Sequence, residues 1–130
     1  MEIKSDDTAM TLYEAVGSEV WFAELVERFY KGVEVDPILK AMYPDDLTDS
    51  KAHLAGFLVQ YWGGPTDYSD ERGHPRLRMR HAPFVIGATE RDSWLDAMRT
   101  AVESMGVSAE IEATLVEYFE MAATNMINQP

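Results

Sequence analysis

Residues 73–84 read GHPRLRMRHAPF, a stretch in which His81 follows a run of cations and apolar residues. No acidic residue lies between Arg72 and His81, although the 130-residue chain has a formal net charge of −12. A cation cluster beside a histidine suggests a site for an anionic ligand whose other end meets the imidazole. The alternative, which charge alone favours, is that these arginines pair with surplus acidic residues elsewhere. The arginines are Arg72, Arg76, Arg78 and Arg80.

Helix signals extend outward from this stretch toward the N-terminus. Residues 11–16 are predicted to form a short helix that ends at Gly17, and Ser18 is expected to cap a second helix to about residue 33. Apolar residues spaced four apart give the second helix one buried stripe. The stripe consists of Trp21, Leu25, Phe29 and Val33.

The middle of the chain predicts two more helices. Asp36-Pro37 is typical of the cap and first turn of a one-turn helix, which we expect to extend through Met42. The next helix starts at Thr48 or Asp49, runs to Trp62 and stops at Gly63-Gly64-Pro65. Its expected inner face consists of Ser50, Leu54, Phe57, Leu58 and Tyr61.

Two long helices are predicted beyond a short turn over residues 76–81. Thr89 with Asp92 resembles a capping box for a helix that ends at Gly106, and Ser108 is expected to cap the last helix. No stretch alternates with period two for long enough to predict a strand. The predicted fold class is therefore all-α, with a domain over residues 11–130 that follows a flexible N-terminal segment, residues 1–10.

Composition excludes several classes of protein. The absence of cysteine rules out disulfides, thiolate metal sites, cysteine nucleophiles and covalently attached haem. Twenty-three acidic against eleven basic residues argue against nucleic-acid binding. No run approaches the roughly 18 apolar residues of a membrane helix, and residues 1–10 lack the pattern of a secretory signal. We therefore expect a cytoplasmic protein without membrane contact.

Chemistry other than anion binding has little support. A dinuclear metal site needs two Glu-x-x-His motifs, and the chain has one, Glu71 to His74, in a region broken by Pro75. A zinc site built from all three histidines stays formally open, but none of them is paired at zinc-ligand spacing. Tyr30, Tyr43 and Trp94 lie on or beside apolar stripes, either as satisfied core aromatics or as polar tips around a ligand, and spacing does not decide between these.

Two motifs resemble the group II truncated haemoglobins of bacteria. One is Tyr61-Trp62-Gly63-Gly64-Pro65, and the other is the stretch 73–84 quoted above. Supporting matches follow in the family's order from about Thr11 to the C-terminus, and an ordered set is more specific than one short motif. These matches are Arg28-Phe29-Tyr30, Met42-Tyr43-Pro44, Arg91-Asp92-Ser93-Trp94 and Glu120-Met121-Ala122-Ala123.

The resemblance implies a two-over-two helical globin that holds a non-covalent haem b, iron protoporphyrin IX. His81 would be the proximal iron ligand. Arg78 and Arg80 would meet the haem propionates, helped by Tyr68 and His53. Apolar residues would line the haem pocket, namely Phe29, Leu54, Phe57, Leu58, Met79, Phe84, Ile86 and Met98.

The resemblance also implies a distal side on which Tyr30, Tyr43 and Trp94 donate hydrogen bonds to bound dioxygen. Ser50 would stand at the distal gate. Three donors should slow oxygen release, which favours redox chemistry of oxygen, nitric oxide or peroxide, or sensing, over bulk transport. Dioxygen and other diatomic gases and an unidentified reductase are the expected partners, and self-association is left open. The alternative function is a haem-free helical interaction module that keeps the globin fold.

Overall fold

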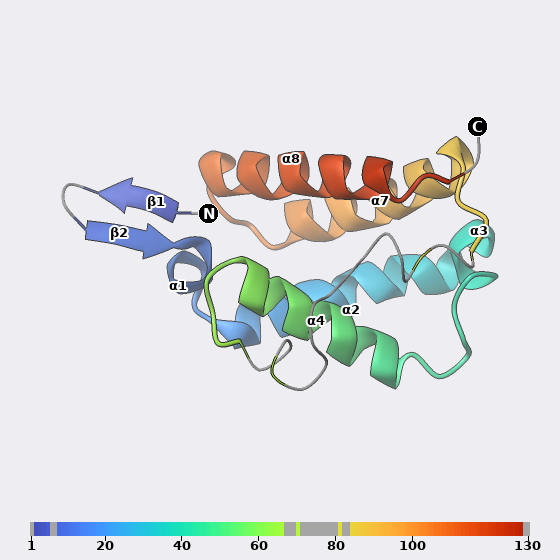
Figure 1. The fold of residues 1–130 in the computed structure, drawn as a ribbon, viewed down its shortest axis with the longest axis horizontal. Coiled ribbons are helices and arrows are strands. Elements are labelled where there is room, and N and C mark those ends of the chain that lie inside the picture. The colour runs from blue at the N-terminus through green and yellow to red at the C-terminus, as the bar shows by residue number, and fades with distance from the viewer. Residues whose placement is uncertain (1, 6–7, 67–69, 71–80, 82–83, 129–130) are drawn as a thin grey trace. The chain divides into compact units, whose positions relative to one another are not determined.

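The computed structural model describes residues 2–5, 8–66, 70, 81 and 84–128, and Figure 1 shows their elements. Most of these residues are helical, which confirms the all-α prediction. The chain divides into two compact units, Met1–Glu27 with Thr48–Pro75 and Arg28–Leu47 with Arg76–Pro130. The elements in chain order are β1 (Glu2–Ser5), β2 (Thr8–Thr11), α1 (Leu12–Val16), α2 (Glu19–Val35), α3 (Pro37–Lys40), α4 (Thr48–Tyr61), α7 (Ala88–Ser104) and α8 (Ala109–Asn125).

The N-terminal hairpin is an element that the sequence does not predict. Strands β1 and β2 pair antiparallel, with Glu2 opposite Thr11 and Ser5 opposite Thr8. Each strand has four residues, which is too short for a period-two pattern to be recognised in the sequence. The chain passes directly from β2 into α1.

Helix caps fall where the sequence places most of them. The Glu14 amide donates to Thr11 Oγ1 at 3.1 Å, and the Thr11 amide donates to Glu14 Oε1 at 3.2 Å, which together form a capping box for α1. Gly17 ends that helix in the left-handed conformation, at φ 99°. Asp36 Oδ1 accepts from the Ile38 amide at 2.9 Å and starts α3. The predicted helix end at Gly17 and the predicted helix start at Asp36 are thereby confirmed, whereas the Thr11–Glu14 capping box is a finding of the structure.

Two local predictions are wrong. Helix α7 begins before Thr89, and it is the Glu90 carboxylate, not Asp92, that accepts the helix-start amide of Gly87, at 2.7 Å. A glutamate three residues after the cap accepts a hydrogen bond from the cap amide. The helix therefore starts closer to the N-terminus than predicted. On α4, Tyr61 is 42% exposed and does not belong to the buried face. The predicted turn 76–81 lies outside the described residues, apart from His81.

In the first unit, the Gly63-Gly64 pair lets the end of α4 approach α1. The Tyr13 amide donates to the Trp62 carbonyl at 3.0 Å. A Cβ at Gly63 would lie 2.6 Å from the Thr11 side chain, and one at Gly64 would lie 2.7 Å from the Tyr13 ring. Both glycines therefore allow the backbone after α4 to pack closely against the start of α1. The buried residues of this unit are Leu12, Phe22, Leu25, Val26, Leu58, Val59 and Trp62.

We expect Gly63→Ala to destabilise the protein more than Gly17→Ala. Both glycines have positive φ, 104° and 99°, so alanine strains the backbone at both. Only at Gly63 does the new Cβ also meet another side chain, because a Cβ at Gly17 would have no heavy atom of the described residues within 4 Å apart from its chain neighbours. The additional loss should be about 1–3 kcal/mol in the free energy of unfolding, measured by urea denaturation. Equal losses for the two variants would contradict this packing argument.

In the second unit, α7 and α8 lie side by side (Figure 1), and α3 packs against α7. Arg28 Nη1 donates to the Ser104 carbonyl at 2.6 Å and ties α2 to the end of α7. The Ser108 hydroxyl accepts from the Ile111 amide and caps α8, as predicted. The buried residues of this unit are Phe29, Tyr30, Val33, Leu39, Ile86, Leu95, Met98, Ala101, Val102, Leu115, Tyr118, Phe119 and Ala123.

Candidate functional site

Three polar aromatic residues of the second unit meet through their side chains. The Tyr30 and Tyr43 rings lie 5.4 Å apart between centroids, at 87° to each other. The Tyr43 phenol forms side-chain hydrogen bonds with Trp94 and with Tyr30. Tyr30 is 3% exposed, whereas Tyr43 and Trp94 are partly exposed. The structure thus brings together the three residues whose spacing left two readings open.

Three separate segments carry these aromatics. Tyr30 lies on α2, which approaches α7 closely because residue 32 is a glycine: a Cβ there would lie 3.2 Å from Ala97 Cβ. Trp94 lies on α7, and its ring is 5.2 Å from that of Phe29. Tyr43 follows α3, where a hydrogen bond from its amide to the Lys40 carbonyl at 3.3 Å continues the turn.

The Tyr43 phenol holds its proton more firmly than an ordinary tyrosine. Burial raises the pKa of Tyr43 above its ordinary value of 10.0, and the hydrogen bonds with Trp94 and Tyr30 lower this pKa only in part. An indole N–H can only donate, so Tyr43 Oη accepts from Trp94. The Tyr30 and Tyr43 hydroxyls can each donate or accept, so the hydrogen bond between them can run in either direction. When Tyr30 donates to Tyr43, the O–H of Tyr43 is the donor that this cluster can offer to a ligand.

This raised pKa predicts an alkaline loss of stability. The folded state keeps the Tyr43 proton at a pH where the unfolded chain has lost it, so the free energy of unfolding falls as pH rises above about 10. Tyr43→Phe removes this contribution, and its stability should fall less steeply over the same range. Denaturant titrations at several pH values, with the phenolate absorbance followed in parallel, measure both effects. Identical alkaline slopes for the two proteins would contradict the assignment.

His81 lies in the second unit, in helical conformation and partly buried. Its ring is 6.4 Å from the Phe84 ring between centroids, and its carbonyl accepts from the Phe84 amide at 3.0 Å. The same carbonyl lies 3.4 Å from Nδ2 of Asn128, beyond the end of α8. Sequence reasoning missed Asn128, and its only signal is an amide residue just after a predicted helix end.

The other predicted site residues fall into four groups. Three are fully buried, namely Phe29, Leu58 and Met98. Ile86 is 5% exposed and Phe84 is 45% exposed, both shortly after His81. Four residues lie outside the described part of the chain, namely Tyr68, Arg78, Met79 and Arg80. Four partly buried residues lie in the first unit on α4, at a spacing that places them along one side of the helix, namely Ser50, His53, Leu54 and Phe57.

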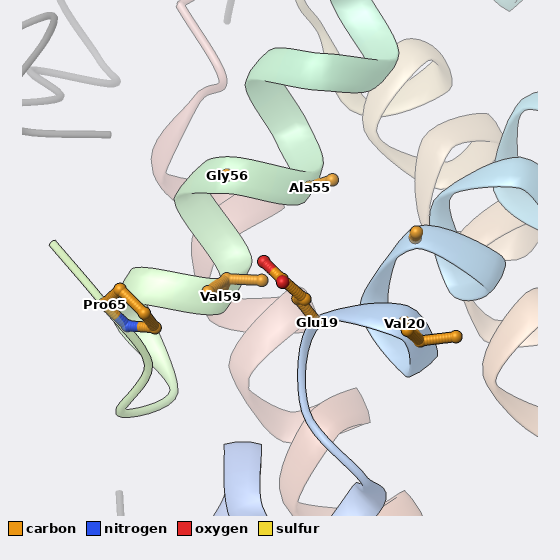
Figure 2. Close-up of a pocket in the computed structure, with 7 residues that line it drawn as sticks. Glu19, Val20, Ala55, Gly56, Val59 and Pro65 are labelled. Atoms are coloured by element: carbon orange, nitrogen blue, oxygen red, sulfur yellow. The ribbon is translucent and has the colours of Figure 1, made fainter. Parts of the chain in front are cut away.

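A pocket of about 320 Å³ lies elsewhere, between the start of α2 and the second half of α4 in the first unit (Figure 2). Among the described residues that line it, Glu19 is the only ionisable one, and none is a tyrosine, tryptophan or histidine. None of the predicted site residues that the structure describes lines this pocket, so it is distinct from the cluster of Tyr30, Tyr43 and Trp94. Its lining consists of Glu19, Val20, Ala23, Ala55, Gly56, Val59 and Pro65.

Comparison with known proteins decides the family. The model of the bacterial-like globins matches residues 11–128. The group 2 truncated haemoglobin of Bacillus subtilis is 43% identical over 117 residues, which cover 90% of this chain and 88% of that protein. The chain belongs to the group 2 truncated haemoglobins. The resemblance inferred from the two sequence motifs is thereby confirmed.

The fold of this truncated haemoglobin matches that of solved structures along almost its whole length. A thermostable haemoglobin from Thermobifida fusca is 54% identical with a TM-score of 0.90, over 93% of this chain and 99% of that one. A truncated oxygen-avid haemoglobin from Bacillus subtilis is 41% identical with a TM-score of 0.86, over 92% and 100%. The truncated globin fold is therefore the fold of this chain.

The side chains of this truncated haemoglobin suit a haem. Haem iron takes an axial nitrogen from the protein, and His81 offers an imidazole on the same unit as three aromatic hydrogen-bond donors. Within the described ranges, no group of three or more His, Asp or Glu side chains is placed to hold a bare metal ion. Family membership supports haem-based gas binding by this chain. No helix of its described part is long and apolar enough to cross a membrane.

Proposed function

We propose that this truncated haemoglobin reversibly binds dioxygen at a haem b ligated by His81 and releases it slowly. The observation that carries the proposal is the hydrogen-bonded cluster of Tyr30, Tyr43 and Trp94. A haem held by His81 supplies the reversible binding of a diatomic gas. The protein supplies donors, an apolar lining and charge partners.

The donors form the distal side of the proposed site. In the proposed arrangement, Tyr43 Oη accepts from Trp94 and from Tyr30, and its own O–H donates to the ligand. The raised pKa of Tyr43 keeps that proton in place at neutral pH. A donor already aimed by two neighbours loses little orientational freedom when it bonds a polarised ligand. The cluster should therefore hold dioxygen more tightly than nonpolar walls would.

The family resemblance supplies the proposed cofactor contacts. Phe84 and Ile86 would contact the haem beside His81, and Leu54 and Phe57 would add apolar contacts from α4. Arg78 and Arg80, with Tyr68, Met79 and His53, complete the proposed set of cofactor-binding residues. Guanidinium groups match the two carboxylates of a haem through charge-assisted hydrogen bonds.

Slow release of dioxygen favours a role in redox chemistry over a role in oxygen transport. Each neutral hydrogen bond contributes about 0.5–1.5 kcal/mol, so two could slow release by roughly one to two powers of ten. The Bacillus subtilis relative described as oxygen-avid supports a slow off-rate for this chain as well. We propose oxidation of nitric oxide by bound dioxygen, or peroxide reduction, with electrons from a partner reductase.

The experiment that tests the proposal is a haem titration of the purified protein. The Soret absorbance should saturate at one haem per chain, and the ferrous protein should change spectrum reversibly with carbon monoxide and with dioxygen. Stopped-flow mixing of the oxygenated protein with carbon monoxide then gives the rate of oxygen release. Absence of saturable haem binding would overturn the proposal and leave the haem-free interaction module.

A further inference from the structure

The side chain and amide of Asn128 hold the segment that follows His81. The Ile86 amide donates to Asn128 Oδ1 at 2.9 Å, and the Asn128 amide donates to the Ile86 carbonyl at 2.8 Å. Asn128 Nδ2 donates to the Phe84 carbonyl at 2.7 Å. The Asn128 side chain thus binds two residues, Ile86 and Phe84, that precede it by 42 and 44 positions in the sequence. We name these three hydrogen bonds the Asn128 clamp.

The clamp extends to His81 in two ways. Asn128 Nδ2 also lies 3.4 Å from the His81 carbonyl, a long contact that shares the same donor group. The Phe84 amide donates to that carbonyl at 3.0 Å, and the Phe84 ring lies beside the imidazole. Fixing the backbone of Phe84 therefore fixes both a donor to His81 and an aromatic neighbour of its ring.

We propose that Asn128 is a positioning residue for His81, which sets the orientation of the imidazole toward the haem. This rests on the proposed role of His81 as the iron ligand. Groups behind a metal-ligating histidine orient the ring and tune the metal. Here, the chain beyond α8 contributes to that orientation, because Asn128 holds the backbone of Phe84, which contacts His81. The side-chain amide of Asn128 faces the Ile86 amide with its oxygen and the Phe84 and His81 carbonyls with its nitrogen. A flipped amide would satisfy none of these three main-chain groups.

The test is Asn128→Asp in the haem-loaded protein, with Asn125→Asp as the matched control. Aspartate keeps the acceptor for the Ile86 amide, but it places an oxygen instead of an N–H opposite the Phe84 carbonyl. We expect a shifted or broadened iron–histidine stretching band in the resonance Raman spectrum of the ferrous protein, and haem loss about tenfold faster. The control is exposed at the end of α8 and should change neither.

Asn128→Ala and amide hydrogen exchange separate positioning from simple stability. Alanine removes the acceptor as well, so exchange at the Ile86 amide should accelerate in this variant, whichever residue ligates iron. An unchanged iron–histidine band in both variants overturns the proposal, even if exchange accelerates, because the clamp then acts on stability alone. If the wild-type protein binds haem through a residue other than His81, the proposed function fails, while exchange at Ile86 still reports whether the clamp exists.

Discussion

His81→Ala is expected to abolish the five-coordinate ferrous spectrum and most of the haem affinity of this protein. The imidazole is the nitrogen ligand that we assign to the iron, and alanine offers no atom that can replace it. His81 lies on the same unit as the donor cluster, and its backbone is already fixed by hydrogen bonds from Phe84 and Asn128. Loss of its side chain should therefore remove the ligand and leave the segment in place. Absorption spectra of the ferric, ferrous and carbon monoxide forms measure the effect.

Two comparisons make this result specific. His74→Ala removes the same group from a residue outside the assigned site, and it should leave the spectrum unchanged. Added imidazole should restore a five-coordinate ferrous spectrum to His81→Ala, because the free base can occupy the space that the side chain leaves. A normal spectrum for His81→Ala without imidazole would show that another residue ligates the iron. The assignment of the proximal ligand would then be wrong.

Short-range signals predict the helices of this protein well. Asp36 with Pro37, and Ser108, each place a helix start where the structure has it, because a cap depends on residues within one turn. The start of α7 is mistaken because two carboxylates, Glu90 and Asp92, stand near it, and the sequence does not show which one reaches back. The hairpin is missed because its strands are too short for a pattern.

Less of the site could be predicted from the residues alone. Periodicity identifies Tyr30, Tyr43 and Trp94 as aromatic residues near apolar stripes, but whether their polar tips meet depends on how α2 approaches α7. That approach rests on Gly32, which no helix signal singles out. Asn128 acts on residues more than 40 positions away, and neither spacing nor propensity reveals such a contact. The family resemblance names the aromatics and His81, whereas only the structure reveals the clamp.

Trp94→Phe is expected to speed dioxygen release by about two- to tenfold, the effect of losing one neutral hydrogen bond. Phenylalanine keeps an aromatic ring against Phe29 and Phe119 but has no N–H. The Tyr43 oxygen then loses the donor that helps to aim its own O–H. Tyr30→Phe removes the other donor and should act in the same direction. The rate of oxygen release is measured by displacement with carbon monoxide.

The double variant distinguishes a network from two independent donors. If the Trp94 and Tyr30 groups act separately, their effects multiply, to as much as about a hundredfold. If both act by aiming the Tyr43 O–H, the second substitution adds little to the first, and Tyr43→Phe alone should equal the double variant. Trp21→Phe and Tyr61→Phe make the same chemical changes in the first unit and serve as controls. If the rate of dioxygen release were unchanged within error in all the cluster variants, the donor network would not be the cause of slow release. Any high oxygen affinity would then have to come from the proximal side.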